Sequence, residues 1–194
     1  MKSELDSLLA EIRKCKECEA HLPLEPRPVL AAGEKARILI VGQAPGIRVH
    51  KSGVPWDDPS GERLRQWMGI QSKDFYDLSK VALVPMGFCY PGTGKSGDLP
   101  PRKECARLWH ERLVGNLPEV KLTMLLGRHA QVYRLGNRSD ANLTETVRAW
   151  RRFTPTCIPL PHPSPRNNRW LKNNPWFLLD VIPYLKRRVR RLLA

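Results

Sequence analysis

Long hydrophobic runs and acidic residues are what this sequence has least of. No apolar stretch approaches the roughly 20 consecutive residues that cross a bilayer, so a transmembrane helix is not expected. The first residues, MKSELDSLLAEIRK, form a charged amphipathic pattern without the apolar core and small-residue cleavage site of a signal peptide. A cytoplasmic globular protein that does not contact a membrane is therefore expected.

The shortage of acidic residues leaves a large positive charge. Only 19 Asp and Glu residues oppose 33 Lys and Arg residues, which gives the 194-residue chain a net charge of +14. Basic side chains that neutralise phosphates release condensed counterions, so this charge predicts a nucleic-acid partner rather than merely a soluble basic surface. Part of the excess lies in a predicted C-terminal helix, where simple solvation is an equal alternative: Lys186, Arg187, Arg188, Arg190 and Arg191.

Cysteines are few and odd in number, which argues against a disulfide framework in a reducing compartment. The first two form a C-x-x-C pair, and this spacing predicts a metal site. Iron–sulfur clusters are held by thiolates, and four cysteines also make a tetrahedral zinc site, so both metals fit the spacing. Cys157, on a predicted strand, is expected in the core.

The hydrophobic pattern predicts an α/β fold. Continuous apolar runs that end in glycine or a loop are typical of strands buried on both faces of a parallel sheet. Such runs occupy 36–42, 80–86, 121–127 and 156–160. Helical periodicity is found before, between and after these runs. The predicted helices are 3–14, 62–70 with Ser60 as N-cap, 102–115, one from 128, 141–153, and 176–193 with an interruption at Pro183. Strands that alternate with helices predict a three-layer α/β/α sandwich with a mainly parallel four-stranded sheet, in one domain spanning 1–194.

Two loops follow predicted strands and carry unusual residues. GQAPG comes directly after the first strand, and HPSPRN follows the last. Glycine allows close approach of a ligand to the backbone, and proline stiffens the loop. Because sites in parallel sheets lie at the carboxyl ends of the strands, both loops are expected to line one crevice. Their candidate substrate-contacting residues are Gly42, Gln43, Ala44, Pro45, Gly46, His162, Ser164, Arg166 and Asn167.

Taken together, the two loops resemble the signature motifs of the uracil-DNA glycosylase superfamily, and the HPSPRN form is similar to that of the single-strand-selective monofunctional enzymes. The resemblance spans roughly residues 10–185. It implies a monomeric enzyme of base excision repair that flips uracil or another deaminated base out of single- or double-stranded DNA, hydrolyses its N-glycosidic bond and leaves an abasic site. Neither motif contains a lysine for a Schiff base, which argues against a lyase step.

The resemblance extends to the cysteines. The layout Cys15-x2-Cys18 followed by Cys89-x15-Cys105 is similar to that of the iron–sulfur glycosylases of families four and five. It implies a [4Fe–4S] cluster on these four residues, with zinc as the alternative on spacing alone.

The segment PWDDPSG, residues 55–61, is where the resemblance implies two further roles. Trp56 stands where family members usually carry a phenylalanine that stacks on the flipped base; a place in the core is the alternative. Asp58 corresponds to the catalytic aspartate of family five; a helix N-cap is the alternative. Gln43 cannot act as a base and can only orient water, so Asp58 is the first choice for the carboxylate, with His50 as the second polar candidate.

The remaining roles fall on the second motif. His162 would stabilise the negative charge that develops on the leaving base. Arg166 or Asn167 would fill the gap that the extruded nucleotide leaves in the base stack.

The sequence departs from the family at the end of the second predicted strand. LVPMGFCYPG lacks the asparagine with which most members recognise the uracil edge, so backbone groups at Met86–Gly87 are the expected substitute. Hypoxanthine and xanthine therefore stay open as substrates. Two other hypotheses also stay open, namely a non-catalytic or covalent-capture DNA-binding protein of the same fold, and a zinc-stabilised module that acts on RNA.

Overall fold

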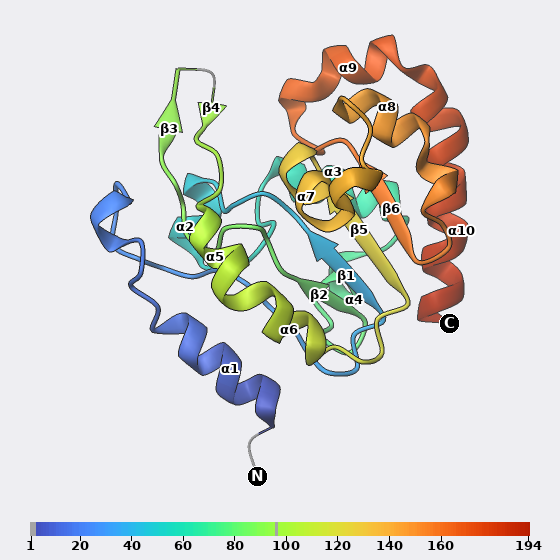
Figure 1. Cartoon of the computed structure of the whole chain (residues 1–194). Coiled ribbons are helices and arrows are strands. Elements are labelled where there is room, and N and C mark those ends of the chain that lie inside the picture. Colours follow the sequence, from blue (N-terminus) through green and yellow to red (C-terminus); the bar gives the residue numbers. More distant parts are fainter. Residues whose placement is uncertain (1–2, 96) are drawn as a thin grey trace.

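The computed structural model describes residues 3–95 and 97–194. Met1 and Lys2, in the N-terminal amphipathic pattern, and Ser96, in the long segment after the second predicted strand, lie outside the described residues. Four parallel strands form the central sheet, in the order β2-β1-β5-β6 (Figure 1). Each lies within one of the four apolar runs, and their bounds are β1 Ile38–Val41, β2 Val81–Leu83, β5 Leu122–Leu126 and β6 Cys157–Leu160.

Helices cover both faces of this sheet. Side chains alternate along β1, so that Leu39 and Val41 enter one core cluster while Ile38 and Ile40 enter the other. The first cluster is covered by α1 (Glu4–Arg13), α5 (Lys103–Cys105), α6 (Glu111–Gly115) and α7 (Arg128–Leu135). The second is covered by α3 (Pro59–Met68), α4 (Ser72–Phe75), α8 (Leu143–Arg148) and α10 (Ile182–Leu193). The predicted three-layer sandwich is confirmed.

The start of α3 differs from the sequence-based expectation. The helix begins at Pro59, and Asp58 rather than Ser60 is its N-cap. Asp58 has an extended backbone, and its Oδ1 accepts a hydrogen bond from the N–H of Gly61 at 2.8 Å. Proline is well suited to the first helical position, because no intrahelical donor is needed there. Ser60 was therefore the wrong cap.

The C-terminal helix is interrupted near Pro183, as expected. A π-helical segment, Phe177–Val181, runs directly into α10, and Pro183 sits in the first turn of α10. Leu185, Val189 and Leu192 are buried along one side, which leaves the basic residues between them on the other.

Several short elements were not expected from the sequence. They interrupt segments rich in glycine, proline or polar residues, which carry too few apolar positions to show a period. Figure 1 shows that the β3–β4 hairpin stands away from the body of the molecule. These elements are α2 (Ile47–Ser52), the antiparallel hairpin of β3 (Thr93–Gly94) and β4 (Gly97–Asp98), and α9 (Asn168–Asn173).

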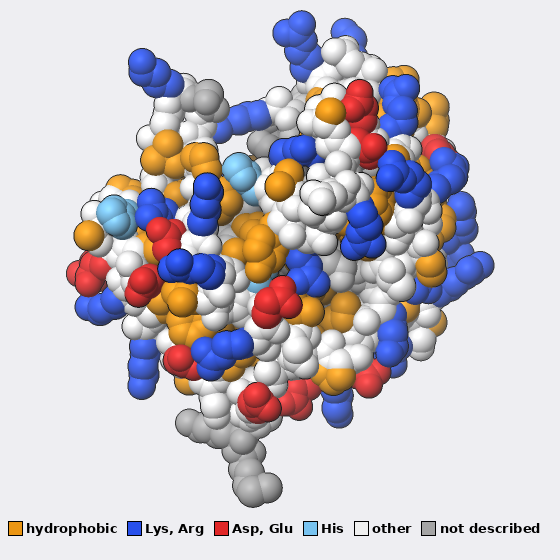
Figure 2. Space-filling view, viewed as in Figure 1, with side chains coloured by type: hydrophobic (Ala, Val, Ile, Leu, Met, Phe, Trp, Pro, Cys, Tyr) orange, Lys and Arg blue, Asp and Glu red, His pale blue; other side chains and the backbone are white. Residues whose placement is uncertain are grey.

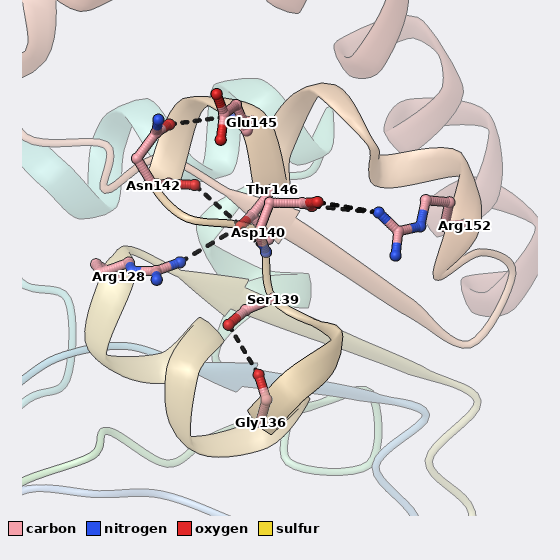
Figure 3. Close-up of polar contacts among 8 residues, drawn as sticks. All are labelled: Arg128, Gly136, Ser139, Asp140, Asn142, Glu145, Thr146 and Arg152. Carbon is pink, nitrogen blue, oxygen red and sulfur yellow. Dashed lines mark hydrogen bonds and ion pairs between the residues drawn. The ribbon is translucent and has the colours of Figure 1, made fainter.

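A polar network fixes the connection between α7 and α8 (Figure 3). The hydroxyl of the buried Thr146 donates to the carbonyl of Asn142 at 3.0 Å and accepts from the N–H of Asp140 at 3.0 Å. Arg128, the first residue of α7, also donates to this hydroxyl, and Arg152 forms an ion pair with Asp140 at 3.1 Å. The segment that leaves β5 is therefore anchored to α8.

Among the described residues, none of the helices combines the length and apolar character that crossing a membrane requires.

Candidate active site

A cavity of about 370 Å³ lies at the carboxyl ends of β1 and β6, where the two motif loops meet. Figure 2 shows Lys and Arg side chains on both sides of the notch between the β3–β4 hairpin and the α9 side of the molecule. All but one of the candidate site residues outside the cysteines line the cavity: Gly42, Gln43, Ala44, Pro45, Gly46, Trp56, Asp58, His162, Ser164, Arg166 and Asn167.

An indole from the segment before α3 and an imidazole from the second motif loop meet in the cavity. The indole of Trp56 stacks on the imidazole of His162, with ring centroids 5.5 Å apart and an angle of 26° between the planes. The indole also lies against Gly42, where an added Cβ would fall 2.8 Å from Cζ2 of Trp56. Trp56 is half-buried and contacts the second core cluster as well, so it combines a core contact with a place in the cavity.

The backbone of Trp56 is held in an unusual conformation. Its φ of 59° lies in the left-handed region, which costs about 1–2 kcal/mol for a residue with a side chain. The first turn of α3 packs against it so closely that a Cβ on Gly61 would lie 1.8 Å from the carbonyl oxygen of Trp56. Glycine at position 61 therefore allows the tight turn that places the indole.

Asp58 both caps α3 and faces the cavity. Burial raises the pKa of its carboxyl group, although hydrogen bonds from the N–H groups of Gly61 and Ser60 and the charges of Arg48 and Arg65 act in the opposite direction. The N-cap alternative for this residue is thus confirmed, and the same side chain is still a wall of the cavity.

His162 is held as a neutral base. Burial lowers the pKa of its imidazole to about 4, so the ring carries no charge at neutral pH. A neutral imidazole offers one N–H donor and one acceptor nitrogen. The carbonyl of His162 accepts a hydrogen bond from Nδ2 of Asn167 at 2.7 Å, which closes the HPSPRN loop on itself.

The HPSPRN loop is braced from two neighbouring elements. Arg63 of α3 donates to the carbonyl of Ser164 at 3.1 Å, and the Ser164 hydroxyl accepts from the N–H of Arg166 at 3.2 Å. The guanidinium group of Arg166 lies directly on Gly97 of β4, where a Cβ would fall 1.6 Å from Nη1. The hairpin, which the sequence did not predict, thus forms part of the site and contributes Asp98 and Leu99 to its wall.

The end of β2 holds the first motif loop. The N–H groups of Met86 and Gly87 donate to the carbonyls of Gly42 and Gln43 at 3.0 and 2.8 Å. These two N–H groups are therefore engaged, and recognition of a base edge by the carbonyls of the same residues stays a prediction. The side chain of Gln43 lies over Gly127, where a Cβ would fall 2.4 Å from Nε2.

His50 is the one candidate outside the cavity wall. Its ring lies on α2 beside Tyr90, with centroids 6.1 Å apart, and Arg27 donates to its carbonyl at 2.8 Å. Among the described residues Nδ1 of His50 is buried without a hydrogen-bond partner. Its contact with substrate stays a prediction.

A second, smaller cavity is lined by Cys15, Cys18, Cys89 and Cys105. Burial raises the pKa of the Cys89 thiol to about 11 and that of Cys105 to about 12. The N–H of Phe88 donates to Sγ of Cys105 at 3.5 Å. Within the described part of the chain, no three His, Cys, Asp or Glu side chains form a ready metal-binding group. Cys157 lies apart on β6, against the first core cluster.

These features define a class of protein: a parallel α/β sandwich with motif loops at its strand ends and a tryptophan stacked on the histidine of the second loop. Comparison with known families identifies that class. The chain belongs to the uracil DNA glycosylase superfamily, whose family model matches residues 30–186. The membership predicted from the motifs is thus confirmed. Among curated proteins, the chain is similar to the type-4 uracil-DNA glycosylase of Archaeoglobus fulgidus, with 25% identity over 147 residues, which cover 74% of this chain and 69% of that protein.

Proposed function

We propose that the protein is a monofunctional DNA glycosylase that removes uracil or another deaminated base from DNA and leaves an abasic site. Superfamily membership and the similarity to a type-4 uracil-DNA glycosylase support glycosylase activity in general. The observation that carries the proposal is the cavity in which Trp56, Asp58 and His162 stand together at the ends of the strands.

Binding begins with the basic surface, which attracts the phosphodiester backbone. The HPSPRN loop enters the base stack, and Arg166 or Asn167 takes the space of the extruded nucleotide. The flipped base then stacks on Trp56, an interaction that contributes about 1–3 kcal/mol per base. Extrusion is required because the glycosidic bond is inaccessible inside a stacked duplex.

Cleavage of the glycosidic bond places negative charge on the base and positive charge on the sugar. His162 is neutral at physiological pH, and its ring N–H donates a hydrogen bond to the leaving base. Asp58, whose raised pKa makes it a stronger base than an ordinary aspartate, holds the attacking water and stabilises the cationic sugar. Gln43 helps to orient that water.

The four cysteines that line the second cavity fit a [4Fe–4S] cluster, because they bring four sulfur ligands and at least one N–H···S hydrogen bond together in an apolar pocket. When bound, such a cluster would crosslink the segment after α1 to the segment between β2 and α6. Iron and acid-labile sulfide analysis of purified protein is expected to give about four of each per chain. Zinc without sulfide would contradict this assignment and favour the zinc hypothesis.

Base release tests the proposed activity directly. Purified protein is incubated with oligonucleotides that carry one uracil, hypoxanthine or xanthine, as single and double strands, and abasic sites are cleaved with alkali. We expect cleavage at the damaged position with at least one base. If none of the three bases gives alkali-dependent cleavage, the proposed catalysis is contradicted.

One observation favours a second candidate, a non-catalytic or covalent-capture DNA-binding protein. One carboxylate oxygen of Asp58 already accepts the hydrogen bond that caps α3, and the first motif carries glutamine at position 43 rather than an acid. Asp58→Asn and His162→Ala separate the two candidates. For an enzyme, base release collapses by about 100-fold or more while DNA affinity stays within a few-fold. For a capture protein, a DNA adduct that survives denaturing electrophoresis replaces turnover.

A further inference from the structure

The β3–β4 hairpin joins the two motif loops at the mouth of the cavity. On one side, Gly97 lies against the guanidinium group of Arg166. On the other side, Oδ2 of Asp98 lies 3.3 Å from where a Cβ on Gly46 would stand. Asp98 therefore reaches the first motif loop while its neighbour touches the second. The hairpin crosses between the loops and places a carboxylate in the wall of the cavity.

Most other polar groups around the cavity already have partners. The N–H groups of Met86 and Gly87 hold the first motif loop, and the carbonyl of Pro85 is 2.8 Å from Nε2 of the buried His110. Asn167 uses its amide to close its own loop, and Asp58 caps α3.

Asp98 differs from these groups. Among the described residues, its carboxylate accepts one hydrogen bond, a long one of 3.5 Å from the hydroxyl of Thr93. The side chain is exposed, so both oxygens keep most of their capacity to accept.

We propose that Asp98 is a specificity-determining residue that recognises the flipped base by accepting a hydrogen bond from its ring N–H. The inference rests on the proposed function and names the group that distinguishes uracil or hypoxanthine from its parent base, cytosine or adenine. It assigns to the hairpin a recognition for which the N–H groups of Met86 and Gly87, bonded to the first motif loop, are not free.

The chemistry of deamination explains why a carboxylate suits this task. Uracil carries a hydrogen on N3 and hypoxanthine carries one on N1, and a carboxylate accepts from either. The corresponding ring nitrogen of cytosine or adenine carries a lone pair instead, which a carboxylate at the same position repels. Discrimination between a deaminated base and its parent then comes both from a gained hydrogen bond and from repulsion of the parent cytosine or adenine.

Binding measurements with methylated bases test this contact independently of catalysis. Oligonucleotides carry uracil or 3-methyluracil, and hypoxanthine or 1-methylhypoxanthine, on a 2′-fluorinated sugar that resists hydrolysis. The dissociation constants of the intact protein for each pair give a preference for the base with the N–H. We expect a preference of about tenfold or more for at least one pair, as for a hydrogen bond to a charged group.

Three variants locate the source of that preference. Asp98→Ala is expected to reduce it to about onefold, and Asp98→Asn, which keeps an acceptor oxygen, to restore part of it. Glu34→Gln makes the same change of charge in the exposed turn before β1 and should keep the wild-type preference. A preference unchanged in Asp98→Ala, or absent from the wild type, would overturn the role of Asp98. Failure of the proposed function shows instead as absence of base release from cleavable oligonucleotides.

Discussion

His162 and Trp56 show how single residues are adapted at this site. Burial disfavours the charged imidazolium, so His162 stays neutral against the indole of Trp56. The left-handed backbone of Trp56 is unfavourable by itself, and the contacts of its indole with Gly42 and His162 stabilise it. The site therefore contains a neutral donor and a fixed aromatic surface before any substrate binds.

The neutral state of His162 has a consequence for stability. An unfolded histidine titrates near pH 6.5 and this one near 4, so the unfolded chain binds more protons between these values. Stability from this group is complete above about pH 6.5 and falls by about 3 kcal/mol as the pH is lowered to about 4. We expect the free energy of unfolding, measured with urea at pH 7 and pH 4.5, to fall less in His162→Asn than in the wild type. Equal losses in both proteins would show that the imidazole is not desolvated.

At the scale of elements, α3 places the catalytic candidates because its first turn touches both Trp56 and Asp58. Asp58 caps the helix, Arg63 braces the HPSPRN loop, and Gly61 leaves room for the carbonyl of Trp56. A small change in the first turn of α3 should therefore move Trp56 and Asp58 and lower the activity of the site.

Gly61→Ala tests the fit between α3 and the preceding turn. Because the added Cβ would lie 1.8 Å from the backbone of Trp56, the turn must move, and we expect base release to fall by about tenfold or more. Loss of stability by about 1–3 kcal/mol in thermal unfolding should accompany it. The matched control is Gly115→Ala in α6, where an added Cβ meets nothing within 4 Å, and its activity should stay at the wild-type level. Similar behaviour of the two variants would contradict the argument.

The sequence predicts the large elements well and the small ones poorly. The strands can be recognised in the sequence because burial on both faces makes them continuous apolar runs, as Ile38–Val41 shows. The cap of α3 is misplaced because both Asp58 and Ser60 suit an N-cap, and only the position of Pro59 decides between them. The β3–β4 hairpin has two residues in each strand and no alternation of apolar positions, so neither it nor Asp98 carries a sequence signal.

The metal site belongs to the same scale, because its ligands come from separate segments. We expect Cys105→Ser to lose most of the bound iron and to unfold at a lower temperature. Cys157→Ser is the matched control, since Cys157 lies on β6 away from the other four and should leave the iron content unchanged. Iron and sulfide per chain, together with thermal melting, provide the measurement. Equal iron in both variants would exclude Cys105 as a ligand.

For the whole molecule, the net charge of +14 governs encounter with DNA. The notch beside the cavity has basic side chains on both sides (Figure 2). A second basic region surrounds a depression next to Gly69 and is formed by Lys186, Arg187 and Arg190. None of these residues lines the cavity.

Salt dependence distinguishes these two basic regions. If about five phosphates are neutralised, the logarithm of the DNA association constant falls with the logarithm of salt concentration with a slope of about −4 to −5. We expect Arg166→Gln to reduce the magnitude of this slope by about one and Arg187→Gln to leave it unchanged, as measured by fluorescence anisotropy. A reduction in Arg187→Gln would assign the C-terminal helix to the DNA interface.

The cavity lined by four cysteines also bears on the hairpin. Cys89 lies four residues before β3, and Cys105 lies seven residues after β4, so both feet of the protruding segment end in the same small pocket. Whatever atom group fills that pocket clamps the two feet together, whereas the sheet behind it is held by its own apolar packing. Emptying the pocket would accordingly loosen the hairpin at the mouth of the cavity more than it loosens the sheet.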